Sequence, residues 1–134
     1  MPERKLTLNI AILFFVFSFL PTLVRAEPPE GYPAGYKEII AAAQKEKKLV
    51  VYSTTDSASA EPLLKDFKAL YPFLQVEYND MNSTELYNRF ISEAAAGTGS
   101  GDLLWSSAMD LQMKLDADGY AQVYESAEIK HLPA

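Results

Sequence analysis

The chain has 134 residues, enough for one domain and too few for two complete ones. It carries 18 Asp+Glu against 12 Lys+Arg, a formal net charge of −6, and this acidic balance argues against a nucleic-acid-binding protein. The sequence contains no cysteine and a single histidine, which excludes disulfides, thiolate metal sites, cysteine nucleophiles and a histidine-rich metal site within it.

The first 26 residues have the order of a secretory signal peptide. A charged start (MPERK) precedes an apolar run that is strongest in AILFFVFSFL, and Val24 and Ala26 are compact residues at the −3 and −1 positions of a cleavage site. Asn9 and Pro21 interrupt the run, which is short for a membrane span of about 20 apolar residues. We expect cleavage after Ala26 and export to the periplasm, with residues 27–134 as the mature part. An uncleaved membrane anchor is the alternative.

After an arm rich in proline and glycine, the mature part alternates between predicted helix and predicted strand. Residues 36–48 (YKEIIAAAQKEKK) have apolar side chains on one face and predict a helix. Residues 49–52 (LVVY) form a short continuous apolar run, typical of a strand buried on both faces of a parallel sheet. The next helix is predicted to begin near Ser59 and to end at Tyr71-Pro72.

The second predicted strand covers residues 73–80 (FLQVEYND), in which apolar and polar side chains alternate. Asn82 and Glu85 then have the spacing of a helix N-cap and its reciprocal partner. The helix that follows is expected to end at the glycine-rich segment 97–101, which is interpreted as a C-cap and loop.

The third predicted strand covers residues 102–105 (DLLW). Ser107 and Asp110 have the spacing of another capping pair and mark the start of a fourth helix, and residues 120–124 are expected to be extended. This order of elements predicts an α/β fold with a mostly parallel sheet flanked by helices.

Hydroxyl side chains gather where two of these strands end, in the loops after LVVY and after DLLW. Ligands of open parallel sheets bind beyond the carboxyl ends of the strands, and hydroxyls at a helix N-terminus suit an anionic oxygen. Simple capping of the following helix is the alternative. The predicted ligand-binding residues are Ser53, Thr54, Thr55, Asp56, Ser57, Ser106 and Ser107.

Catalysis has weaker support in the sequence. His131 lies far along the chain from both serine-containing loops, and no Gly-x-Ser-x-Gly elbow is present. We therefore expect a protein that is not an enzyme and has no cofactor and no metal. The rival hypothesis is an exported hydrolase, for example a phosphatase with Asp56 or a serine as nucleophile.

From residue 37 to about residue 133 the chain resembles the N-terminal part of bacterial extracellular solute-binding proteins of ABC importers, on the branch typified by ferric-iron-binding proteins. The resemblance is carried by LVVYSTTDSASAEPLLKDFKALYPFLQVEYND, AAAGTGSGDLLWSSAMD and LDADGYAQVYE, in this order. It implies a periplasmic-binding-protein-like lobe of a two-lobed protein that closes on a solute and delivers it to a membrane permease. The two hydroxyl-rich loops would face the cleft.

Ferric-binding members of that family typically place a histidine in the first loop and a glutamate in the second, at positions that fall near Asp56 and at Ser107 in this chain. Hydroxyls are poor ligands for a hard trivalent cation and good hydrogen-bond partners for oxyanions. The expected solute is therefore a small organic phosphate or carboxylate. Iron, or an iron complex, stays open because the tyrosine pair of the family would lie in the second lobe. We expect a monomeric N-terminal fragment that lacks this lobe, and a non-functional truncated remnant is the remaining alternative.

Overall fold

The structure, a computed structural model, describes residues 26–99 and 101–132. The elements in chain order are α1 (Tyr36–Glu46), β1 (Lys48–Ser53), α2 (Ser57–Leu70), β2 (Gln75–Asp80), α3 (Ser83–Ala95), β3 (Leu103–Trp105), α4 (Met109–Ala117) and the 3-10 helix η1 (Ile129–His131). The predicted signal peptide lies outside the described residues except for Ala26. No helix in the described part is long and apolar enough to cross a membrane.

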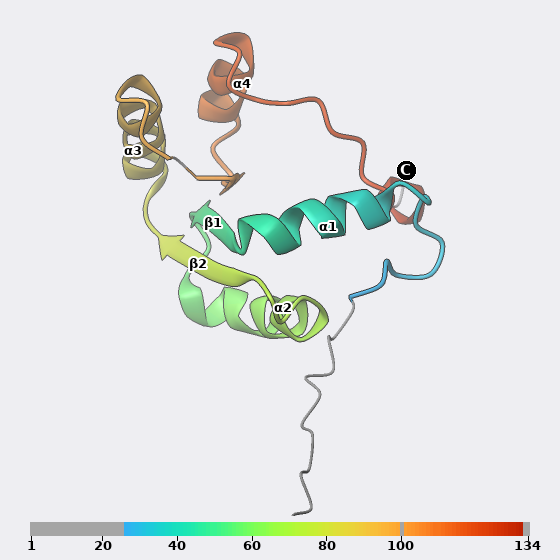
Figure 1. The fold of residues 1–134 in the computed structure, drawn as a ribbon. Coiled ribbons are helices and arrows are strands. Elements are labelled where there is room, and N and C mark those ends of the chain that lie inside the picture. The colour runs from blue at the N-terminus through green and yellow to red at the C-terminus, as the bar shows by residue number, and fades with distance from the viewer. Residues whose placement is uncertain (1–25, 100, 133–134) are drawn as a thin grey trace, which may run out of the picture.

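The three strands form one parallel sheet in the order β2-β1-β3, with β1 in the centre (Figure 1). Strand β1 pairs along its whole length with β2, from Lys48 opposite Gln75 to Ser53 opposite Asp80. A helix separates each strand from the next in the sequence. The predicted α/β fold with a mostly parallel sheet flanked by helices is confirmed.

Helices pack against both faces of the sheet. Tyr52 of β1 belongs to a buried cluster with Leu86 and Phe90 of α3 and Leu115 of α4. Because successive strand residues face opposite sides, Leu49 points to the other face, where it lines an apolar cavity together with side chains of α1 and α2. Figure 1 shows α3 and α4 on one side of the sheet and α2 on the other.

Many large apolar side chains stay exposed in the described part of the chain. Met109 and Met113 of α4 are 67% and 68% exposed, and Val123, beyond α4, has no cover at all. Single exposed apolar side chains are common on protein surfaces. Several large aliphatic side chains in neighbouring segments are less common and are typical of an interaction surface. The parallel three-stranded sheet with its flanking helices matches part of a periplasmic-binding-protein-like lobe, as the resemblance implied.

The boundaries of some elements differ from the prediction. Helix α1 ends at Glu46 because Lys47 adopts a left-handed conformation with φ of 61°, and Lys48 already belongs to β1. Helix α2 begins at Ser57, before the predicted start near Ser59. Residues 120–124 belong to no strand.

The predicted start of α3 is confirmed. Asn82 is the N-cap, and its Oδ1 accepts a hydrogen bond from the Glu85 amide at 2.9 Å. The side chain of Glu85 returns to the side chain of Asn82, with Nδ2 and Oε2 3.4 Å apart. At the other end of the helix, Gly97 has a φ of +65°, the left-handed conformation that glycine adopts without strain.

Candidate functional site

The seven predicted site residues lie in two neighbouring loops at the carboxyl edge of the sheet. Ser53 is the last residue of β1 and Ser57 the first of α2, and Ser106 and Ser107 come directly after β3. The two loops are joined through the backbone, since the Thr54 amide donates to the Trp105 carbonyl at 3.0 Å. The structure therefore brings the two predicted loops together, as the parallel sheet requires.

Ser53 differs from the other six in burial. It is fully buried, and its Oγ accepts a hydrogen bond from the Thr55 amide at 3.0 Å. In this structure the Ser53 hydroxyl shapes the β1–α2 loop from inside. Direct contact between Ser53 and a solute stays a prediction.

Two carboxylates occupy the N-terminal end of α2. Asp56 is the N-cap and accepts from both the amide and the hydroxyl of Ser59, at 2.9 Å and 2.7 Å. Asp80, at the end of β2, accepts from the Ser57 amide at 3.1 Å. The hydrogen bond from the Ser59 hydroxyl, followed by those from backbone amides, lowers the pKa of Asp56 below its usual range. The chain's own negative charge thus takes the place that an anion would occupy at this helix end.

The N-terminal end of α4 has no such cap. Ala108 is the N-cap residue and makes no side-chain cap hydrogen bond, so the predicted Ser107–Asp110 capping pair is wrong. Ser106 bonds locally instead, its Oγ accepting from the Ala108 amide at 3.1 Å. The pair fails because α4 begins after Ala108, so Ser107 lies one residue ahead of the cap position. The first backbone bond of the helix runs from Gln112 to the Ala108 carbonyl.

Some hydroxyl groups of the two loops remain available for a ligand. Four of the predicted site residues have hydroxyls that make no hydrogen bond to another described residue: Thr54, Thr55, Ser57 and Ser107. The backbone amides of residues 109–111 likewise find no acceptor in the described part of the chain. These hydroxyls and amides are therefore available as hydrogen-bond donors to an oxygen-rich ligand at this edge of the sheet.

Two residues that the sequence analysis did not single out shape the site from β2. They are Asp80, described above, and Tyr78, whose hydroxyl donates to the Thr55 carbonyl at 2.6 Å. The Tyr78 ring also meets the ring of Trp105 edge-on, with centroids 6.5 Å apart. The alternation in FLQVEYND placed Tyr78 on an apolar face, but it gave no sign of a partner 23 residues away.

The two aromatic residues near the strand ends have different environments. Tyr52 is 2% exposed and belongs to the core, whereas Trp105 is 36% exposed beside the site.

Within the described residues, no group of three or more histidine, aspartate or glutamate side chains could hold a metal ion.

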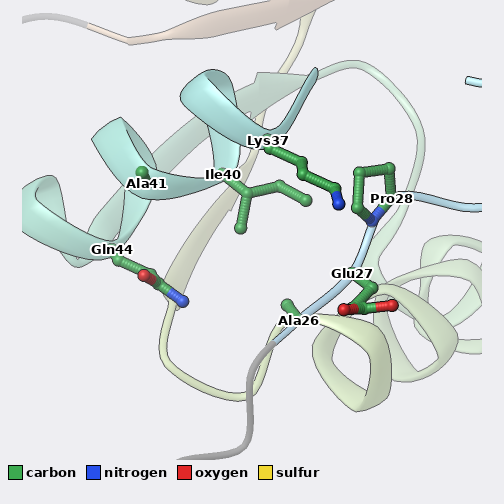
Figure 2. A pocket seen from close by; sticks show the side chains of 7 residues that line it. All are labelled: Ala26, Glu27, Pro28, Lys37, Ile40, Ala41 and Gln44. Carbon is green, nitrogen blue, oxygen red and sulfur yellow. The ribbon is translucent and has the colours of Figure 1, made fainter. Parts of the chain in front are cut away.

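Two cavities lie away from the strand ends. The pocket in Figure 2, about 100 Å³, lies between the N-terminal arm and α1, where Lys37 extends toward Pro28. A larger cavity of about 450 Å³ opens on the sheet face that α3 covers, and four of its charged side chains form two ion pairs, Lys48 with Glu77 at 2.7 Å and Arg89 with Glu93 at 2.9 Å. Neither cavity contains a predicted site residue.

No protein-family model matches the chain, and no curated protein does. Among solved structures, the chain is similar to the substrate-binding protein of the ABC transporter from Agrobacterium tumefaciens, with 43% sequence identity and a TM-score of 0.60. The match covers 66% of this chain and 26% of that protein, so the chain spans about a quarter of its length. The similarity supports the class of solute-binding proteins that the sequence indicated.

Proposed function

We propose that this chain is a substrate-binding component of an ABC-type import system, or the N-terminal part of one. The observation that carries the proposal is the 43% identity, at a TM-score of 0.60, with a substrate-binding protein of an ABC transporter. The hydroxyl-rich carboxyl edge of a parallel sheet supports it independently, because this is where α/β proteins of open-sheet type bind ligands.

The solute that we propose is a small organic anion, either a phosphate or a carboxylate. The support comes from the donors around α4: the Ser107 hydroxyl and the unaccepted amides of residues 109–111 lie at the positive end of the helix. The Thr54 and Thr55 hydroxyls lie in the adjoining loop. An iron complex of such an anion fits the same donors, whereas bare ferric iron does not fit hydroxyls.

These residues would form one wall of the binding site. The chain spans about a quarter of the solved relative, and large apolar side chains such as Met109 and Met113 lack cover. A solute-binding site buries most of the ligand's surface, which one open edge of a three-stranded sheet does not do. We therefore propose that tight binding requires a second wall from a longer protein.

The remaining parts of the proposal concern the cellular location, the partner and the oligomeric state. The sequence of residues 1–26 supports export to the periplasm with cleavage after Ala26, and the resemblance to importer components supports a membrane permease as the partner. We propose that the chain acts as a monomer in this role.

Fluorescence of Trp105 tests the proposed site directly. Trp105 is the single tryptophan of the chain and adjoins Ser106. Titration of the 134-residue chain with inorganic phosphate, glycerol 3-phosphate, citrate and ferric citrate is expected to change its emission with at least one probe. The double variant Ser106→Ala, Ser107→Ala should weaken binding of the responding probe by about 1–3 kcal/mol, because hydrogen bonds to the anion are lost.

Ser126→Ala is the matched control. The Oγ of Ser126 accepts from the Glu128 amide at 3.2 Å, the same local turn that Ser106 makes with Ala108, but remote from the site in sequence. Equal loss of affinity in the control, or unchanged affinity in the double variant, would remove Ser106 and Ser107 from the site. No response to any of the four probes at millimolar concentration, where one wall of donors should still bind weakly, would contradict the proposed class of solute.

A further inference from the structure

One side chain of β2 contacts both hydroxyl-rich loops at once. Tyr78 lies opposite Val51 in the parallel register, and its hydroxyl donates to the Thr55 carbonyl at 2.6 Å. Its ring packs edge-on against Trp105, with an interplanar angle of 75°. Trp105 directly precedes Ser106, so Tyr78 touches the β1–α2 loop at one point and the root of the β3–α4 loop at another.

The contact from Tyr78 is one of three hydrogen bonds that hold the backbone at Thr54 and Thr55. The Thr55 amide is held by Ser53 Oγ, and its carbonyl is held by Tyr78. The neighbouring Thr54 amide is held by the Trp105 carbonyl. Three consecutive peptide groups are therefore each held by one hydrogen bond, while the Thr54 and Thr55 side-chain hydroxyls make no hydrogen bond to a described residue. Such an arrangement fixes the backbone that carries these hydroxyls and lowers the ordering cost of binding.

We propose that Tyr78 is a positioning residue of the solute site, which fixes the two loops relative to each other through Thr55 and Trp105. We assign it a positioning role and not a donor role, because the one proton of its hydroxyl is used by the Thr55 carbonyl. The proposal rests on the proposed function for the identity of the solute, but its structural part is testable without any solute.

The test compares two tyrosines whose hydroxyls make hydrogen bonds of the same length. Tyr78→Phe removes the 2.6 Å bond to Thr55 and keeps the ring, and Tyr52→Phe removes a 2.6 Å bond to Glu93 Oε2 on the opposite face of the sheet. Both variants are expected to lower the midpoint of urea unfolding by similar amounts. Amide hydrogen exchange of the 134-residue chain, measured without solute, separates them.

In Tyr78→Phe we expect exchange at Thr54 and Thr55 to accelerate about tenfold or more, with increased acrylamide quenching of Trp105. In Tyr52→Phe both quantities should stay near those of the natural chain. Equal acceleration in the two variants, or no acceleration in Tyr78→Phe, would overturn the positioning role.

A parallel titration with the probes named above measures the functional consequence. Tyr78→Phe is expected to weaken binding of the responding probe about tenfold, with no change in Tyr52→Phe. Unchanged affinity in Tyr78→Phe would overturn the proposal. A natural chain that responds to no probe at millimolar concentration, with the exchange difference intact, would contradict the proposed class of solute and leave the loop coupling established.

Discussion

The two loops at the carboxyl edge of the sheet have similar compositions and opposite local chemistry. At the β1–α2 loop, Asp56 of the loop and Asp80 at the end of β2 accept hydrogen bonds from amides in the first turn of α2. In the β3–α4 loop, no side chain caps α4. Hydroxyl-rich loops before helices are therefore not equivalent anion sites, because a site needs donors that the chain has not already used. This difference locates the proposed contact with an anion at α4.

The largest effect that we expect from this comparison is on stability and involves two serines. Ser53→Ala should destabilise the chain by about 1–3 kcal/mol, because it leaves the Thr55 amide without its acceptor beneath the loop. Ser107→Ala should change stability by less than about 0.5 kcal/mol, since its hydroxyl is exposed and bonds to no described residue. Urea unfolding measures both. Equal changes in the free energy of unfolding would contradict the difference between a buried, hydrogen-bonded Ser53 and an exposed Ser107.

A cap transplanted onto α4 should make the second loop resemble the first. Ala108→Asp is expected to stabilise the helix by about 1 kcal/mol, as a side-chain N-cap does. It should also weaken anion binding about tenfold or more, because like charges about 4 Å apart repel by about 1–4 kcal/mol between water and a protein surface. Titration and urea unfolding measure the two effects.

The matched control for this variant is Ala108→Asn, which supplies a cap without charge. It should stabilise the helix similarly and weaken binding less than Ala108→Asp does. Equal binding in the natural chain and both variants would contradict an anion contact at this helix end.

The smallest expected effect is on affinity for an anion and concerns Asp56, the N-cap of α2. Asp56→Asn keeps a capping side chain and removes a negative charge near the site, so affinity for an anionic probe should rise about two- to fivefold at low salt. Higher salt should reduce the gain. A loss of affinity would indicate that the Asp56 carboxylate contacts the solute, which the structure does not predict.

The pH dependence of stability provides a second readout of the same residue. The pKa of Asp56 is lowered in the folded chain, mainly by the Ser59 hydroxyl. Its stabilising contribution is therefore complete above the usual carboxyl pKa and is lost as the pH falls through the lowered value. Asp56→Asn should lack this part of the acid destabilisation when urea unfolding is compared between pH 7 and pH 2.

The sequence was sufficient to predict the architecture because its signals are local. The apolar run LVVY, the alternation in FLQVEYND and the Asn82–Glu85 spacing each identify an element or its start, and the structure confirms these elements. The parallel order then brings the two loops together, since the carboxyl ends of parallel strands lie at the same edge.

The sequence was insufficient for the chemistry of the loops because the deciding contacts are between distant residues. Asp80 reaches the Ser57 amide and Tyr78 reaches the Thr55 carbonyl, each across 23 residues. The cap of α4 was mispredicted for a local reason. Ser107 has the right side chain, but the helix begins after Ala108, and a shift of one residue removes the capping geometry.

The most direct test of an anion contact at α4 is to follow the backbone amides by NMR while citrate, and separately glycerol 3-phosphate, is added to the 134-residue chain. We expect the largest chemical-shift changes at the amides of Ser107 and residues 109–111, with small changes at Ser57 and Ser59, whose amides are bonded to carboxylates. Changes centred on Ser57 and Ser59, or no changes with either anion at millimolar concentration, would contradict it.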